Sequence, residues 1–187
     1  MKRLMPFLAA LALALGLSAC GSGGLDLTPG GQQEDGSGAR YGALGDALST
    51  EWFDFTVESA RSGAQYGTCT AGGGRQLVVA ALTLKNTCGA AVEMWEDDFV
   101  LLWDDPGGDG GIAVPLPAGL EPGQFPDRYT LGAGETKSGE LVFEAPTGIE
   151  EFTIGFQEIY ADEENPDSET GIEGRTFFVT FRPGEAE

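Results

Sequence analysis

The residues of this sequence with the clearest capacity for chemistry are carboxylates grouped in a glycine-rich stretch. Asp104, Asp105 and Asp109 lie within the sequence DDPGGDGG at 104–111. Calcium is bound by about 6–8 hard oxygen ligands, often in loops where a glycine allows a sharp turn. The spacing does not match an EF-hand loop. We interpret the stretch as a solvated loop, with a Ca²⁺-dependent binding module as the alternative. No other cofactor is predicted.

Catalysis by nucleophile and base finds little support in this chain. It contains 0 histidines, which excludes Ser-His-Asp and Cys-His chemistry within the chain. Glu140, Glu144 and Glu158 could supply the paired carboxylates of a glycosidase. However, Glu140 and Glu144 recur at period two with Val142, which is typical of the solvent face of a sheet. We therefore predict that the protein is not an enzyme.

Aromatic residues outside the regular apolar pattern offer a binding surface instead. Trp95, Tyr129 and Tyr160 are the candidates for this binding patch. The formal net charge of −20 repels phosphate backbones, so no nucleic-acid partner is expected. The predicted partner is an envelope or extracellular protein or glycan.

The elements that carry these residues are predicted to be short strands separated by turns. Apolar residues alternate with polar ones, or form short apolar runs, in six segments: 52–58, 77–84, 99–103, 141–143, 152–156 and 177–181. Clusters of glycine, proline, asparagine and aspartate separate them at 71–74, 86–89, 104–111, 117–123 and 165–171. Residues 93–98 could form one helical turn at most. This pattern predicts an all-β fold, an immunoglobulin-like antiparallel β-sandwich.

The N-terminus has the composition of an export signal. Lys2 and Arg3 are followed by an apolar run of about 14 residues, 4–17. That length suits the apolar region of a secretory signal and falls short of the ~20 residues that span a membrane. A short buried helix is the alternative.

The end of this signal resembles the lipobox of bacterial lipoproteins. Leu17, Ser18 and Ala19 directly precede Cys20. The resemblance implies cleavage before Cys20 and acylation of its thiol by a diacylglycerol. Two acyl chains give stable anchoring where one does not. It therefore implies a protein anchored in the cell membrane on the extracytoplasmic face. The alternative is an ordinary signal cleaved near Ala19, with Cys20 in a disulfide.

Three regions follow from these assignments. Residues 1–19 are the signal peptide, and residues 20–45 are the lipidated cysteine with a glycine-rich flexible tether. Residues 46–187 are the β-sandwich domain. Packing of residues 44–48 as a first strand is the alternative for the boundary.

The domain also resembles a family of bacterial lipoprotein domains of unknown function. The resemblance rests on a strand that closes on Asn86 and Thr87, on the DFVLLW stretch at 98–103, and on LGAGETKSGELVFEAP at 131–146. It covers roughly residues 50–182. It implies the telokin-like, immunoglobulin-like sandwich also found in some secreted immunoprotective antigens, and no catalytic residues. The acidic insertion at 161–175 and the two remaining cysteines depart from the usual pattern.

Those two cysteines, Cys69 and Cys88, are predicted to form a disulfide, because exported proteins favour oxidised pairs. The predicted strand 77–84 lies between them and would span ~27 Å when fully extended. Bridging therefore requires residues 70–76 to run back along that strand. Two separate thiols are the alternative.

Overall fold

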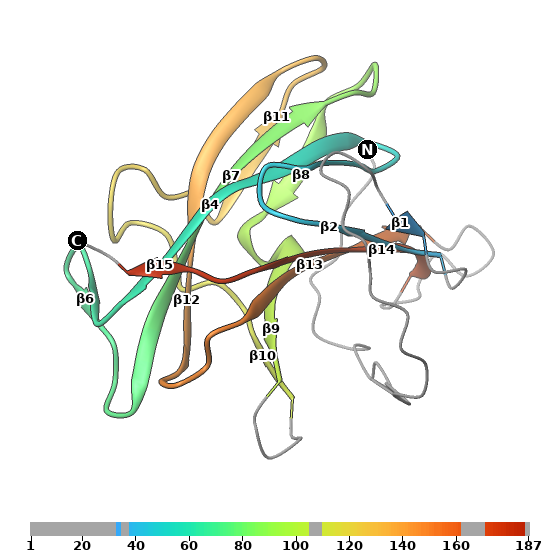
Figure 1. Cartoon of the computed structure of the whole chain (residues 1–187). Helices are drawn as coiled ribbons and strands as arrows, with labels where there is room; N and C mark the ends of the chain where they lie inside the picture. The colour runs from blue at the N-terminus through green and yellow to red at the C-terminus, as the bar shows by residue number, and fades with distance from the viewer. Residues whose placement is uncertain (1–32, 35–37, 105–109, 162–170, 186–187) are drawn as a thin grey trace, which may run out of the picture.

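The computed structural model describes residues 33–34, 38–104, 110–161 and 171–185. Almost all of its regular structure is β-strand, arranged as two sheets packed face to face. In Figure 1, the orange and red strands β13 and β14 of one sheet run across β4, β7 and β12 of the other. The predicted all-β sandwich is therefore confirmed.

The larger sheet has six strands in the order β1-β2-β14-β13-β9-β10. β2 pairs parallel with β14, and the other pairs of this sheet are antiparallel. The bounds of its strands are β1 Gln33–Glu34, β2 Ala39–Gly42, β9 Phe99–Trp103, β10 Gly111–Ala113, β13 Phe152–Tyr160 and β14 Ile172–Phe181.

The second sheet has the order β12-β7-β4-β15, and β3 pairs with β4 off this path. Two short ribbons accompany it, β5-β6 and β11-β8. The strands are β3 Ala47–Ser49, β4 Phe53–Gly63, β7 Arg75–Asn86, β12 Thr136–Pro146 and β15 Gly184–Glu185. Those of the ribbons are β5 Gln65–Tyr66, β6 Cys69–Thr70, β8 Val92–Trp95 and β11 Arg128–Leu131.

The core lies between the two sheets and is rich in phenylalanine. Alternation along β4 turns Phe53 and Phe55 inward, where both are completely buried. Their rings meet those of Phe99 and Phe156 from the larger sheet, with centroids 5.1–6.5 Å apart. Tilted and edge-to-face contacts at this spacing add to the hydrophobic burial.

A second, smaller apolar cluster covers the outer face of the β12-β7-β4 sheet. Tyr66, Leu77, Val79 and Val142 form it, with Cys69 and Leu116 among the residues packed against it. β7 therefore buries side chains on both faces, as its apolar sequence predicted.

One local expectation requires correction. β2 precedes the predicted domain boundary at residue 46, yet it pairs with residues 176–179 of β14, and Ala39 is buried. The sandwich therefore begins earlier than predicted. Sequence pattern hides this strand because the main chain of β14, rather than an apolar run, holds it. The single helical turn allowed over 93–98 is confirmed as η1, a 3₁₀ turn at Glu96–Asp98 that follows β8.

No helix among the described residues combines the length and apolar character needed to cross a bilayer.

Candidate functional site

The most elaborate polar arrangement in the described chain surrounds Glu158 on β13. Its side chain follows those of Phe152, Ile154 and Phe156 at every second position, on the buried face of the strand. A β-bulge occurs here in the partner strand: from Gln157 to Ile159, β13 advances two residues while β14 advances three, from Thr176 to Glu173. The bulge sets Gly174 and Arg175 opposite Glu158, whose exposed fraction is 0%. A buried carboxylate must be paired or hydrogen-bonded to be tolerated.

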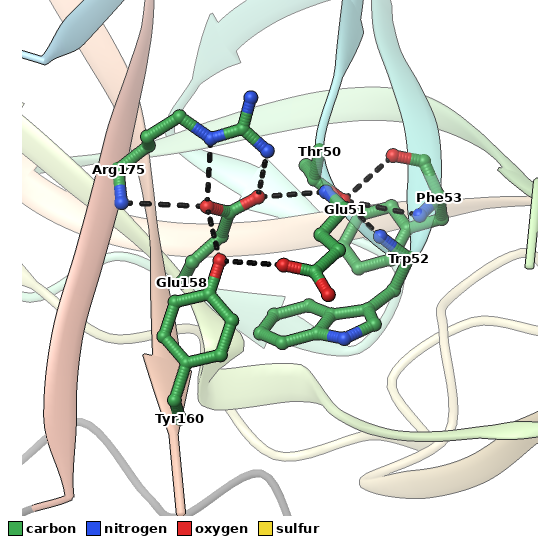
Figure 2. Close-up of polar contacts among 7 residues, drawn as sticks. All are labelled: Thr50, Glu51, Trp52, Phe53, Glu158, Tyr160 and Arg175. Carbon is green, nitrogen blue, oxygen red and sulfur yellow. Dashed lines mark hydrogen bonds and ion pairs between the residues drawn. The ribbon is translucent and has the colours of Figure 1, made fainter.

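Five hydrogen bonds satisfy this carboxylate (Figure 2). Its Oε1 accepts from the backbone N–H of Glu51 at 2.7 Å and from Nη2 of Arg175 at 2.8 Å. Its Oε2 accepts from Nε of Arg175 at 2.9 Å, the hydroxyl of Tyr160 at 3.0 Å and the backbone N–H of Arg175 at 3.3 Å. Burial acts to raise the pKa of Glu158, but these donors outweigh it and hold the pKa below its ordinary value.

An aromatic pair covers this ion pair. The Tyr160 ring lies 5.3 Å from that of Trp52, and the Tyr160 hydroxyl is 2.9 Å from Oε2 of the exposed Glu51. Burial, followed by the hydrogen bonds to the two glutamates, raises the pKa of Tyr160. The close approach requires Gly174, because a Cβ there would lie 2.8 Å from Cβ of Glu158 and closer still to the Tyr160 ring.

The loop that supplies Glu51 and Trp52 is fixed by Thr50. The Thr50 hydroxyl accepts from the N–H groups of Trp52 and Phe53 at 3.1 and 3.0 Å, and donates to the Phe53 carbonyl at 2.8 Å. The cluster therefore joins the β3–β4 loop of one sheet to β13 and β14 of the other. Both carboxylate oxygens of Glu158 are therefore fully hydrogen-bonded. Glu51 is exposed and Tyr160 is partly exposed.

The two other strand carboxylates considered for catalysis are also held by arginines. Glu140 accepts from Arg61 at 2.7 Å and from the Tyr66 hydroxyl at 2.6 Å. The hydrogen bond from Arg61 outweighs partial burial and lowers the pKa of Glu140. Glu144 lies 3.9 Å from Nε of Arg75 and accepts from a backbone N–H at 2.8 Å.

The residues of the predicted aromatic patch fall into two places. Tyr160 belongs to the Glu158 cluster, whereas Trp95 and Tyr129 lie on the paired strands β8 and β11. The guanidinium of Arg128 covers the Trp95 ring at 4.4 Å and also pairs with Glu93. Tyr129 stacks on Phe125 at 5.3 Å. The structure does not bring the three rings together as one platform.

The predicted disulfide is absent, because Cys69 and Cys88 are both free thiols. Cys69 packs against the outer cluster of the β12-β7-β4 sheet, while Cys88 packs against the main core between the sheets. The Cys88 thiol donates to the Ala90 carbonyl at 3.1 Å. The two thiols are thus on opposite faces of one sheet and at different points along β7, and the disulfide prediction is wrong for this structure.

The other predicted sites fall largely outside the described residues. Asp104 is exposed directly after β9, but Asp105 and Asp109 are not described. Cys20, the predicted lipidation site, is also outside the described part. Among the residues that are described, no three acidic, cysteine or histidine side chains are grouped to hold a metal ion.

The motif residues that carried the family resemblance serve the fold. The Asn86 amide donates to the carbonyls of Ala90 and Leu131, both at 2.9 Å. Asp98 accepts from the Trp95 N–H at 2.8 Å, and Glu135 accepts from the Gly132 N–H at 2.7 Å. These side chains hold turns.

The Glu51–Glu158–Arg175 network is not apparent from the sequence, because its members are far apart in the chain. One signal existed: Glu158 interrupts the alternation of FTIGFQEIY at 152–160. A charged residue in a strand that otherwise alternates is a sign of a bulge or a buried partner.

Comparison with solved structures identifies similar sandwiches. A candidate lipoprotein of Bacillus subtilis, ycdA, aligns with a TM-score of 0.54 at 12% identity, over 73% of this chain and 38% of ycdA. An uncharacterised β-sandwich protein of Clostridium difficile 630 gives 0.50 at 12% identity, over 76% of this chain and 93% of that one. The yjhA protein of B. subtilis gives 0.50 at 15% identity, over 73% and 98%. These identities establish similarity of fold alone.

No protein-family model matches the sequence, and no curated protein matches it closely enough to identify a relative.

Proposed function

We propose that this protein is a lipoprotein anchored on the extracytoplasmic face of the cell membrane, whose β-sandwich is a non-catalytic binding module. The observation that carries the proposal is the sandwich itself, whose fold is similar to that of a candidate lipoprotein. The lipobox-like residues before Cys20 support the same role. The fold similarity and the N-terminal pattern are independent of each other.

The state of the strand carboxylates supports the non-catalytic part of this proposal. A general acid works best when its pKa lies near the operating pH. The pKa values of Glu140 and Glu158 are instead held below the ordinary value by arginine partners. Each carboxylate is a fixed hydrogen-bond acceptor rather than a proton donor.

The position of the first strands suits a tethered module. The chain enters the sandwich through β1 and β2, at one edge of the six-stranded sheet (Figure 1). Twelve residues of the sequence lie between Cys20 and Gln33, the first residue of β1. We infer a domain joined to its anchor through this stretch and repelled from anionic headgroups by its own negative charge.

Cell fractionation and intact mass test the anchor. The wild-type protein is expected in the membrane fraction, as a chain beginning at Cys20 with the mass of a diacylglycerol adduct. Cys20→Ala should remove the adduct and release the protein from that fraction. Cys88→Ala is the matched control, because it removes a thiol from the sandwich and should leave the mass of the lipid adduct unchanged. An unmodified wild-type chain would overturn the anchor.

Cross-linking in intact cells tests the binding role. A photoreactive residue at Ile112 or at Ile172, which are 50% and 52% exposed, samples both ends of the larger sheet. We expect a discrete adduct from at least one position in the anchored protein and its loss in Cys20→Ala. Absence of adducts from every exposed position of the sandwich would contradict a binding module.

A further inference from the structure

The turn η1 and the segment that crosses it form a compact unit outside the Glu158 cluster. Residues 116–127 run along the edge of β12 before entering β11. The N–H of Glu96 in η1 donates to the Asp127 carbonyl at 3.1 Å. The Asp127 carboxylate in turn accepts from the Ala118 N–H at 2.6 Å. Asp127 therefore connects the end of the segment to Ala118 near its start, and also connects the segment to η1.

A carboxyl group without a cation is buried within this unit. Asp98 is only 2% exposed, and its Oδ2 accepts from the Trp95 N–H at 2.8 Å. None of the ion pairs formed within the described residues involves Asp98. A buried carboxylate without a counter-ion is disfavoured relative to its neutral acid.

A second carboxyl lies at the contact between turn and segment. Oε2 of Glu96 is buried and accepts no hydrogen bond. The charges nearest to it are those of Asp127 from the crossing segment and Asp97 from the same turn. Both are negative, so ionisation of Glu96 meets repulsion as well as lost hydration.

The charged side chains on the adjacent strands do not compensate. From β8, Glu93 faces Arg128 of β11, and that guanidinium is occupied by this pair and by the Trp95 ring. From β12, the Lys137 amine lies 5.4 Å from the centre of the Tyr129 ring, and Tyr129 itself faces Asp98. The cations of β11 and β12 are thus engaged elsewhere.

Burial raises the pKa of Asp98 to about 8, with Asp97 adding to the shift against the hydrogen bond from Trp95. Burial also raises the pKa of Glu96 to about 7; the charge of Asp127, a side-chain hydrogen bond with it and the charge of Asp97 add to the shift, against a hydrogen bond from the Ala118 N–H. In the closed structure, therefore, both carboxyls lose their protons at pH values around neutrality.

We propose that η1 and segment 116–127 form a proton-dependent latch, closed when the buried carboxyls of Glu96 and Asp98 carry protons and opened when they lose them. In the open state the four carboxylates of Glu96, Asp97, Asp98 and Asp127 gain water. Phe125 lies in the segment and stacks on Tyr129 of β11, so opening would separate these two rings and expose them. The latch would make this face of the sandwich respond to the acidity outside the membrane.

The direction of the pH dependence follows from the raised pKa values of Glu96 and Asp98. An open turn binds protons with ordinary affinity, so between about pH 4.5 and pH 8 the open form has released protons that the closed form keeps. Closure therefore weakens as the pH rises. For one group of this kind, the opening equilibrium should increase at least about tenfold between pH 5.5 and pH 8.5.

Amide hydrogen exchange of the full mature chain tests the latch. After correction for intrinsic exchange, peptides covering 116–127 should lose at least about tenfold in protection between those two pH values. Glu96→Gln should lose less protection than the wild type over this range, because it removes one of the two titrating carboxyls and leaves Asp98. Glu121→Gln is the control in the same segment, since its carboxylate lies against Gly67 rather than η1, and it should behave as wild type.

Asp98→Asn is a second variant that should also reduce the loss of protection at high pH. If Asp98→Asn does not fold, the comparison of Glu96→Gln with the wild type tests the proposal. Protection of segment 116–127 that is independent of pH in the wild type would overturn the proposal. So would a pH dependence that Glu96→Gln leaves unchanged.

Discussion

Replacement of Glu158 by glutamine should destabilise the sandwich, because the substitution keeps the volume but exchanges one acceptor oxygen for an NH₂ group. Whichever way the amide turns, that NH₂ meets donors. On one side it faces Nη2 of Arg175 and the Glu51 N–H; on the other it faces Nε and N–H of Arg175, beside the Tyr160 hydroxyl. The buried charge that balances Arg175 is lost at the same time.

The magnitude follows from the burial of the two partners. Breaking a buried ion pair by removing one charge costs about 3–5 kcal/mol. The Arg175 side chain is 36% exposed, so part of its charge can be hydrated after the change. We therefore expect the free energy of unfolding to fall by about 2–3 kcal/mol for Glu158→Gln.

Urea unfolding at neutral pH measures this change, with tryptophan fluorescence as the signal because Trp52 lies against Tyr160. Glu151→Gln is the matched control: its carboxylate pairs with Arg182 at 3.3 Å, where the two side chains are 58% and 73% exposed. That exposed pair should contribute less than about 0.5 kcal/mol. A loss below about 1 kcal/mol for Glu158→Gln, or equal losses for the two variants, would refute the reasoning.

Three further predictions concern packing, thiols and pH. Gly174→Ala should lower the free energy of unfolding by about 1–3 kcal/mol, because the new Cβ would collide with Glu158 and Tyr160. Thermal unfolding compares it with Gly73→Ala, whose Cβ would have no atom within 4 Å and which should change the stability by less than about 0.5 kcal/mol. Cys69 and Cys88 should both react with a thiol reagent in denaturant without reductant, and a mass without adducts would restore the disulfide. The pKa of Glu158 is lowered from 4.5, so its ionised side chain stabilises the fold fully above that pH and less as the pH falls below it. Between pH 4.5 and about pH 3 the wild type should therefore lose stability faster than Glu158→Gln does, which acid titration followed by fluorescence measures.

Local pattern predicted the sandwich well because the sequence period of a half-buried strand is two residues. The segments 152–156 and 177–181 alternate in sequence, and in the structure they lie within β13 and β14 with Phe156 and Phe177 buried. The apolar run at 77–84 lies within β7, which is covered on both faces. Burial of one or both faces imposes these patterns directly on the residues.

Short strands at or next to the edges of the sheets carried no such pattern. β2 and β15 are held in parallel by the main chains of β14 and β4, so their own side chains need no regular alternation. Backbone pairing is nearly independent of residue type, and this is why the boundary of the domain lay earlier than composition indicated.

The sequence by itself determined the class of fold, the acidic character of the chain and the expectation of export, since all three depend on composition and on neighbours in the chain. Only the tertiary structure decided which charges are paired. Glu158 and Arg175 meet through a bulge and a strand pairing, Glu51 reaches them from the other sheet, and Cys69 and Cys88 are separated by the sheet that lies between their two clusters. Such contacts join residues tens of positions apart, and the register of the strands, rather than any local preference, brings them within reach or keeps them separate.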